Sequence, residues 1–221
     1  MEERTRTHLL SPQERRLRNR QEVIEAILTA AREIMRRDGV AALNLNEVAR
    51  LVGMQTPSLY KYFSSKFALY DVLFRMGVRL FRESEERVWG SSQPIWERIQ
   101  LWFETRLFLA QEHADLYHLV FDNPVPGFVP SEESLEESRK VRLPGMQAIR
   151  AAIDAGSIAT PLPPDRVFDL LLAMRRGIIA EYLGKETHLP KGDERFRSLV
   201  PEVLTLLKAV WTPQHYQQQP S

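Results

Sequence analysis

Apolar residues recur every three or four positions along nearly the whole chain, which is the period of an amphipathic helix. The clearest example lies between residues 23 and 35, where the spaced residues are Val23, Ile24, Ile27, Leu28, Ala31, Ile34 and Met35. A run with the two-residue period of a strand does not occur, and no segment of the sequence is repeated. The sequence therefore predicts an all-helical, all-α fold.

The first helix has a start signal and a stop signal. Ser11, Pro12 and Glu14 combine a capping hydroxyl, a proline suited to the first turn and a carboxylate that can bond back to the cap. Asp38 and Gly39 form the stop. We therefore expect a helix that begins near Pro12 and ends near Asp38.

Two short helices joined by a tight turn are expected next. Asn44 can cap the amide of Glu47 and open a helix that ends at Gly53. Pro57 is tolerated in a helix only in the first turn, so the second short helix opens at residues 55–62. A long helix follows, and its buried stripe is expected to contain Phe67, Tyr70, Leu73, Phe74, Gly77, Leu80 and Phe81.

Basic residues are concentrated at the start of the chain. Residues 1–66 hold 12 Lys or Arg against 8 Asp or Glu, whereas the remainder holds 18 against 21. Half of the early cations stand close together, namely Arg4, Arg6, Arg15, Arg16, Arg18 and Arg20. This density is typical of a segment that binds a polyanion, and equally of a solvated tail.

Several classes of protein are disfavoured by what the sequence lacks. The chain has no cysteine, so it has no disulfide, no thiolate metal site and no cysteine nucleophile. No apolar run approaches the ~20 residues needed to cross a bilayer, and the first residues are charged rather than apolar. A Gly-rich phosphate loop, a nucleophile beside a base and a metal-ligand spacing are also missing. We therefore expect a cytoplasmic protein that is not an enzyme and that uses no membrane, cofactor or metal.

The segment from Asn44 to Lys66 resembles the helix-turn-helix signature of the TetR family of bacterial transcriptional regulators. The resemblance is carried by Leu45-Asn46-Glu47-Val48-Ala49, Gly53, Ser58-Leu59-Tyr60-Lys61-Tyr62-Phe63 and Ser65-Lys66. It extends over about residues 20–75, and the rest of the chain is similar to the family in its helical pattern and length. One departure is Asn46, which stands where many relatives carry arginine.

The resemblance implies a helix-turn-helix DNA-binding unit followed by a larger helical domain for ligand binding and dimerisation. The expected boundaries are 1–19 for a basic extension, 20–66 for the DNA-binding unit, 67–89 for a connecting helix, 90–211 for the larger domain and 212–221 for a disordered tail. The expected partners are double-stranded DNA with a palindromic operator, a partly apolar small-molecule effector and a second copy of the chain.

The second short helix of such a unit lies in the major groove, where its polar side chains read the bases. Gln55 can pair with adenine, Thr56 can contact a thymine methyl, and Tyr60 or Lys61 can hold a phosphate or a guanine. The full set of predicted DNA contacts is Arg18, Arg20, Asn44, Asn46, Gln55, Thr56, Pro57, Ser58, Tyr60, Lys61, Tyr62 and Lys66. The last of these resembles the family's phosphate-anchoring lysine.

Two alternatives stay open in this region. Val48, Leu59 and Phe63 are expected in the core, whereas Tyr62 fits either the core or the DNA. The basic row at residues 15–20 either continues the first helix along the phosphates or reaches a minor groove as a frayed arm.

The second half of the chain contains aromatic and polar residues that could enclose a small-molecule site. The predicted ligand contacts are Trp102, Phe103, Arg106, His113, Tyr117, His118, Phe121, Met146, Met174 and Arg175. Ordinary core packing is the alternative for each aromatic residue. Arg175 and Arg176 interrupt an apolar helix, so at least one should meet an anionic ligand, Glu181 or an acid of a partner chain.

The last two predicted helices have more apolar surface than one chain covers easily. A two-fold, four-helix interface would bury it, as the family resemblance also implies. The predicted interface residues are Phe168, Leu172, Ile179, Leu183, Leu199, Val203, Leu207 and Val210.

These observations predict a dimeric transcriptional regulator, a repressor that a small molecule releases from its operator. The helix at residues 67–89 is expected to couple the ligand to the DNA. The alternative is a ligand- or protein-binding regulator of the same fold that does not bind an operator.

Overall fold

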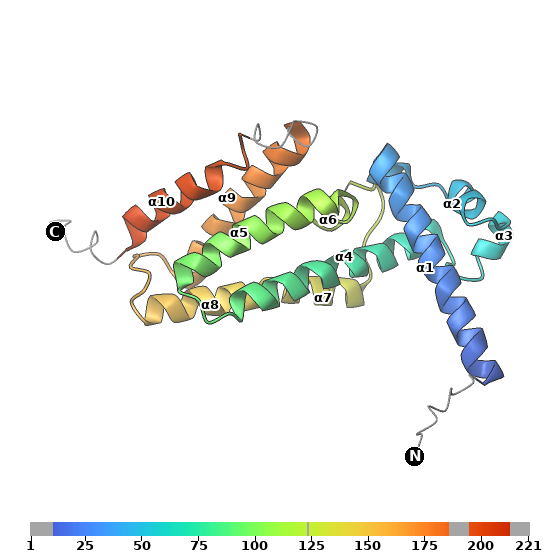
Figure 1. Ribbon diagram of the computed structural model, residues 1–221, viewed down its shortest axis with the longest axis horizontal. Coiled ribbons are helices and arrows are strands. Elements are labelled where there is room, and N and C mark those ends of the chain that lie inside the picture. The colour runs from blue at the N-terminus through green and yellow to red at the C-terminus, as the bar shows by residue number, and fades with distance from the viewer. Residues whose placement is uncertain (1–10, 123, 186–194, 213–221) are drawn as a thin grey trace, which may run out of the picture. The chain divides into compact units, whose positions relative to one another are not determined.

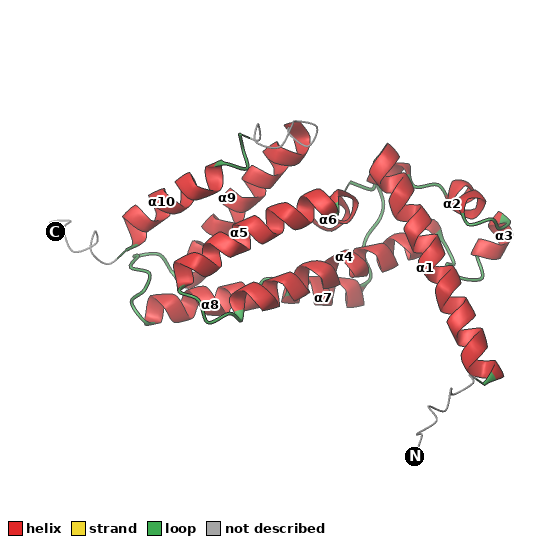
Figure 2. Ribbon diagram, viewed as in Figure 1, coloured by secondary structure: helices red, strands yellow, loops and turns green. Residues whose placement is uncertain are grey.

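The computed structural model of the chain describes residues 11–122, 124–185 and 195–212. Within these ranges the regular elements are helices and no strand occurs, so the all-α prediction is confirmed (Figure 2). The elements are α1 (Pro12–Asp38), the 3-10 helix η1 (Val40–Ala42), α2 (Leu45–Leu51), α3 (Thr56–Leu59), α4 (Lys66–Trp89), α5 (Ile95–Glu112), α6 (Ala114–Phe121), α7 (Glu132–Lys140), α8 (Leu143–Asp154), α9 (Pro164–Lys185) and α10 (Leu199–Trp211) (Figure 1).

The chain divides into two compact units, Met1–Tyr70 and Asp71–Ser221, which are called unit 1 and unit 2 below. The helix α4 contributes its first residues to unit 1 and the others to unit 2. The predictions for Arg4, Arg6 and the tail beyond Thr212 lie outside the described residues.

The first helix begins and ends where its capping signals indicate. The hydroxyl of Ser11 accepts a hydrogen bond from the amide of Glu14 (3.2 Å), and the Glu14 carboxylate accepts one from the Ser11 amide (2.7 Å). Gly39 ends the helix at φ 93°, a conformation that favours glycine. The basic row at residues 15–20 therefore continues the helix, and the alternative of a frayed arm at these residues is wrong.

The core of unit 1 lies between α1, α2 and the segment after α3. Val48, Leu59 and Phe63 are buried, as predicted. Ile27 and Ile34 of α1 are also inaccessible to solvent. Phe67, predicted on the buried stripe of the long helix, is instead 44% exposed. The short helices are thus held by a small apolar core that leaves their polar side chains outside.

Two local predictions in this unit are wrong in detail. The side chain of Asn44 caps the amide of Asn46 (2.9 Å), not that of Glu47, whose carboxylate binds Arg37 at 2.7 Å. The second short helix ends at Leu59, and the chain continues in turns. A bond from the Tyr62 amide to the Leu59 carbonyl (2.9 Å) stabilises these turns, so the segment keeps a compact, helix-like path.

Tyr70 titrates as a buried phenol in this structure. Its ring is fully covered, its hydroxyl donates to the Val40 carbonyl at 2.6 Å, and burial raises its pKa to about 12. The pKa of a tyrosine in the unfolded chain is about 10. The neutral, buried hydroxyl of Tyr70 therefore stabilises the fold below pH 10, and this stabilisation is lost as the pH rises toward 12. We expect the wild type to lose more stability than Tyr70→Phe between pH 10 and 12 in urea unfolding, and an equal loss would contradict this assignment.

Unit 2 is a group of helices that pack around α5. This helix packs against α6, α8, α9 and α10, and α8 also packs against α9. Trp102 and Phe103 of α5 lie in the core, where Trp102 contacts Phe168 of α9. Gly145 allows the close approach of α8, because a Cβ there would lie 2.4 Å from the Phe168 ring.

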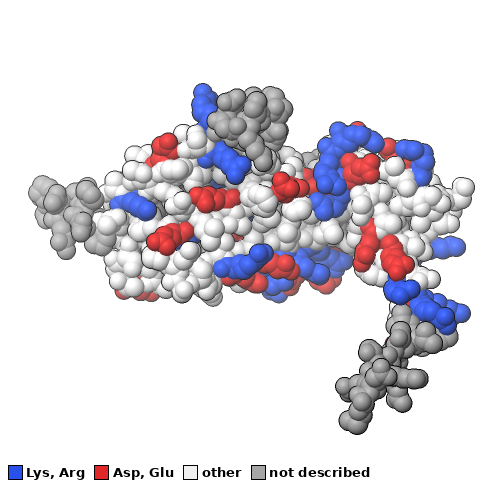
Figure 3. Space-filling view, in the orientation of Figure 1, with Lys and Arg blue, Asp and Glu red and all other residues white. Residues whose placement is uncertain are grey.

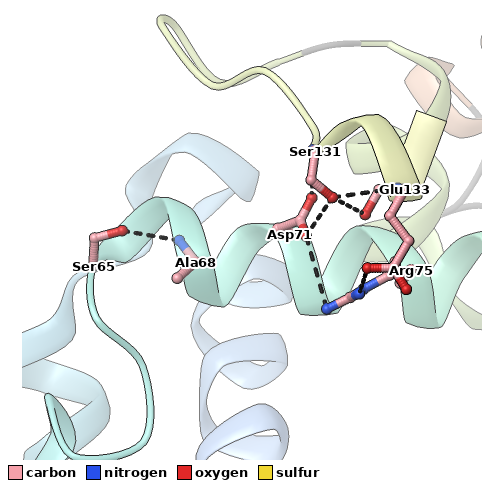
Figure 4. Close-up of polar contacts among 7 residues, drawn as sticks. Ser65, Ala68, Asp71, Arg75, Ser131 and Glu133 are labelled. Atoms are coloured by element: carbon pink, nitrogen blue, oxygen red, sulfur yellow. Dashed lines mark hydrogen bonds and ion pairs between the residues drawn. The ribbon is translucent and has the colours of Figure 1, made fainter.

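Polar contacts connect α7 to the start of unit 2 (Figure 4). Asp71 accepts hydrogen bonds from the amide and the hydroxyl of Ser131 at 2.8 and 3.0 Å, and Arg75 binds Glu133 at 2.9 Å (Figure 4). The expected break at Pro144 is present, because α7 ends before it and the proline occupies the first turn of α8. Across the described ranges, every helix is too short or too polar to span a bilayer.

Candidate nucleic-acid interface and ligand cavity

The segment at residues 55–61 presents one face to solvent, although Thr56 and Ser58 are half-buried. Gln55, Pro57 and Lys61 are exposed, and Tyr60 is 51% exposed although it is a large aromatic residue. Leu59 points the other way and is fully buried. The segment is therefore anchored on one side and free to contact a partner on the other.

Neighbouring helices hold this segment through side-chain contacts. The Thr56 hydroxyl donates to Asn46 Oδ1 of α2 at 3.0 Å. Arg20 of α1 donates to the Lys61 carbonyl at 3.3 Å, and its guanidinium lies 5.0 Å from the centre of the Tyr62 ring. Tyr62 is consequently half-buried beneath Arg20 and is less available than Tyr60.

The other predicted DNA contacts differ in their exposure and in the contacts that they already make. Lys66 is half-buried, with Nζ 3.5 Å from the Ala41 carbonyl oxygen and 5.6 Å from the centre of the Tyr70 ring. Arg18 is exposed and forms an ion pair with Glu22 (3.3 Å). Asn44 uses its side-chain oxygen as a helix cap. Arg side chains also lie at the described start of α1 (Figure 3), so unit 1 combines an exposed polar segment with exposed cations.

Unit 2 contains a buried ionic cluster that the sequence analysis only partly found. Glu85 of α4 is 2% exposed, and its carboxylate accepts hydrogen bonds from the indoles of Trp89 (2.8 Å) and Trp102. It also pairs with Arg106 of α5 and, at 3.1 Å, with Arg175 of α9. One carboxylate thus joins three helices and faces two guanidiniums.

Burial and charge act against each other in this cluster. Burial raises the pKa of Glu85, but Arg175, Arg106 and the indole donors outweigh it and hold the pKa below its usual value. Burial lowers the pKa of Arg175 to about 9, because Glu85 compensates only in part and Arg106 adds repulsion. Burial lowers the pKa of Arg106 as well. The cluster therefore carries one more positive charge than negative.

A cavity of about 200 Å³ adjoins this cluster. It is lined by Glu85, Arg106, Tyr117, Phe121, Ser138, Val141, Arg142, Phe168, Leu172, Arg175 and Arg176. Four of the predicted ligand contacts are among them, namely Arg106, Tyr117, Phe121 and Arg175. Phe168 and Leu172, which we assigned to a subunit interface, line the cavity instead.

The remaining predicted ligand contacts do not line this cavity. Trp102 and Phe103 belong to the core behind it, and His118 binds Asp122 at 2.6 Å. Met174 is 39% exposed on α9. His113 lies between α5 and α6, and Met146 lies on α8. Glu181, the expected partner of the arginine pair, binds Lys185 instead, and Arg176 donates to the Phe121 carbonyl at 2.8 Å.

The sequence analysis missed Glu85, although a signal for it exists. Phe81, Glu85 and Trp89 are four residues apart, so Glu85 falls on the buried face of the long helix. Because the neighbours of Glu85 in the sequence are mostly charged, the segment resembles a solvent-exposed one. In the residues that the structure describes, no group of three His, Asp or Glu is placed to hold a metal ion.

The predicted interface residues divide between the core and the surface. Phe168, Ile179 and Leu207 are buried within the chain, so they are already covered without a partner. Leu199 and Val210 are exposed, while Leu172, Leu183 and Val203 are half-buried. The large apolar residues exposed on α9 and α10 are Leu170, Met174, Leu199, Leu206 and Val210.

Comparisons with known proteins agree with this architecture. Residues 27–73 match the model of the bacterial regulatory proteins, tetR family. No match occurs among the curated proteins compared with the chain.

Solved structures of bacterial proteins share the fold along most of their length. A protein of unknown function from Rhodococcus sp. RHA1 is 21% identical at a TM-score of 0.69, covering 92% of this chain and 96% of its own. The transcriptional regulator FadR from Bacillus subtilis, solved with stearoyl-CoA, is 16% identical at a TM-score of 0.62, with 83% and 96% covered. A TetR family regulator from Marinobacter aquaeolei VT8 is 15% identical at a TM-score of 0.65, with 89% and 99% covered. At these identities the likeness concerns the fold.

Proposed function

Because the N-terminal segment of this chain belongs to the tetR family of bacterial regulatory proteins, we propose that the protein is a ligand-responsive transcriptional repressor. It binds a palindromic operator in the cytoplasm as a homodimer, and a small molecule in unit 2 lowers its affinity for DNA. The observation that carries the DNA-binding part is the exposed segment at residues 55–61, which Arg20 and Asn46 hold in place.

The segment has the side chains that a major-groove contact requires. Gln55 offers an amide that can pair with adenine, and Lys61 offers a cation for phosphate or guanine. Thr56 contributes its methyl group, because its hydroxyl is engaged with Asn46. Since the backbone of the segment is bonded internally and to α1, these groups are positioned before DNA arrives.

A selection from a random pool of duplex DNA tests this function. We expect the protein to enrich an inverted repeat whose half-sites are centred about 34–36 Å apart, or a multiple of that distance. Affinity for the enriched duplex should fall steeply as salt is raised, because phosphate contacts release counterions. A pool that stays unenriched at low salt would favour the alternative, a regulator of the same fold without operator binding.

Dimerisation is proposed from the exposed apolar side chains of α9 and α10. Leu206 is 68% exposed and Val210 is 63% exposed, one helical turn apart on α10. Such a patch is costly to leave in water and typical of a subunit contact.

The double variant Leu206→Glu, Val210→Glu is therefore expected to be a monomer of about 26 kDa in sedimentation velocity, while the wild type sediments as a dimer. Charges placed in the contact would repel each other across the two-fold axis. Thr205→Glu, on the exposed side of the same helix, should leave the dimer intact. A wild-type monomer, or a double variant that still dimerises, would contradict this interface.

The cavity beside Glu85 is the proposed effector site. FadR from Bacillus subtilis was solved with stearoyl-CoA, and the cavity of this chain, about 200 Å³, is smaller than the ~300 Å³ at which ordinary ligand pockets begin. We therefore expect a compact effector. The coupling element is α4, which supplies Lys66 to unit 1 and Glu85 to unit 2, and the effector must bind the two states of this helix unequally.

A further inference from the structure

The cavity in unit 2 is strongly biased toward positive charge. Its lining contains the arginines 106, 142, 175 and 176 but only one acid, Glu85. Arg142 is paired with Asp169 at 2.6 Å, and Arg176 is exposed and bonded to a backbone carbonyl. Arg106 and Arg175 are buried and share the single carboxylate of Glu85, so one of their two positive charges has no acid to balance it.

These two arginines also have hydrogen-bond donors to spare. In the described part of the chain, Nε and Nη1 of Arg106 and Nε of Arg175 are buried and have no hydrogen-bond partner. Arg106 is 2% exposed and Arg175 is 5% exposed, so bulk water does not satisfy them. Buried donors without partners are few in proteins and call for an explanation, and a bound acceptor is one of them.

Both guanidiniums lie against aromatic rings. The Arg175 guanidinium carbon lies 3.5 Å from the centre of the Trp102 ring. That of Arg106 lies 4.5 Å from the centre of Phe81 and 5.3 Å from the centre of Phe121. A guanidinium held against aromatic rings can still donate through its N–H groups, and two of them can bind one planar carboxylate.

The rest of the lining is apolar. Phe121, Val141, Phe168 and Leu172 contribute rings and branched side chains to the same cavity. A ligand that matches both the arginines and the apolar lining of the cavity has one negative end and a compact apolar body. Because two guanidiniums face one glutamate, a single negative charge balances the site.

We propose that this cavity binds a small organic monocarboxylate, with its carboxylate on Arg106 and Arg175 and its apolar body against Phe121 and Phe168. The inference rests on the proposed function only in assigning this molecule the role of effector. Binding itself concerns the ligand unit and needs no DNA.

Calorimetric titration of the full chain without DNA tests the charge of the ligand. The probes are phenylacetate and hexanoate, each compared with its neutral amide of nearly the same shape. We expect at least one acid to bind with a Kd below about 1 mM and its amide to bind at least about tenfold more weakly. If neither acid binds in this range, or if an amide binds as well as its acid, the inference is wrong.

Three variants locate the bound carboxylate. Arg175→Met should weaken acid binding by about tenfold or more, and it should fold because Glu85 keeps Arg106 as its partner. Glu85→Gln should strengthen acid binding by about threefold or more, because it removes the internal competitor while keeping an acceptor for the indoles. Arg166→Met, an exposed arginine on the same helix α9, should change nothing.

The wild type separates binding from a purely structural role. Arginines that serve only to neutralise Glu85 would bind no acid while Glu85 is present, and that result would overturn the inference. DNA experiments are read separately. Acid binding without release of DNA would leave the inference standing and refute induction. DNA binding without acid binding would refute the inference and leave the proposed DNA-binding function standing.

Discussion

The double variant Tyr60→Ala, Lys61→Ala is expected to bind the selected duplex at least about 100-fold more weakly than the wild type. Both side chains lie on the exposed face of the segment at residues 55–61, so their loss removes contacts to DNA without opening the core. The loss corresponds to about 3 kcal/mol shared between two contacts, which is an ordinary value for base and phosphate contacts. Fluorescence anisotropy at a stated salt concentration measures it.

A matched control accompanies this experiment. Arg150→Ala removes an exposed cation from α8 of unit 2 and should leave DNA affinity unchanged. The thermal melting temperatures of both variants should equal that of the wild type, since neither alters a buried contact. If the double variant bound DNA as tightly as the control, the segment would not be the recognition element.

The second large effect concerns the buried cluster around Glu85. Glu85→Ala leaves Arg106 and Arg175 buried without their common carboxylate, and loss of such a partner costs about 3–5 kcal/mol. We expect this fall in the free energy of unfolding in urea, followed by tryptophan fluorescence, because the indoles of Trp89 and Trp102 both donate to Glu85. The pKa of Glu85 is depressed, so its contribution is present above pH 4.5 and is lost as the pH falls further.

A compensating variant makes this result specific to charge. Replacing Glu85, Arg106 and Arg175 together by Gln, Met and Met removes both signs of charge and keeps an acceptor for the indoles, so it should recover stability to within about 1 kcal/mol of the wild type. An alanine variant as stable as the wild type, or a triple variant no better than the single one, would show that the cluster does not hold unit 2 together.

The sequence predicted best what neighbouring residues determine. Ser11 and Glu14 specify the start of α1, and Gly39 specifies its end, because capping and positive φ are local properties. The motif residues Leu59 and Phe63 were placed correctly in the core for the same reason. Asn44 was recognised as a cap, but the choice between two nearby amides depends on backbone angles that the sequence does not specify.

Contacts between distant residues were harder to predict. Arg175 meets Glu85 across 90 positions of sequence, while the nearer Glu181 looked like the natural partner and instead binds Lys185. Phe168 and Leu172 were assigned to a subunit contact because an apolar stripe does not reveal whether its own chain or a second copy covers it. The predicted aromatic contacts also divided, because Trp102 and Phe103 of α5 belong to the core whereas Tyr117 and Phe121 of α6 line the cavity, and only the packing of helices distinguished them.

The most direct test of the central claim is DNA cleavage from a label placed beside the recognition segment. Since the chain has no cysteine, Ser64→Cys creates a single attachment point for an iron chelate that cuts nearby DNA. On the selected duplex we predict two symmetric clusters of cuts whose centres lie about 34–36 Å, or a multiple of it, apart. The same label on Thr205→Cys of α10 should not cut at these positions. Uncut or randomly cut DNA in a complex that remains bound would contradict the account.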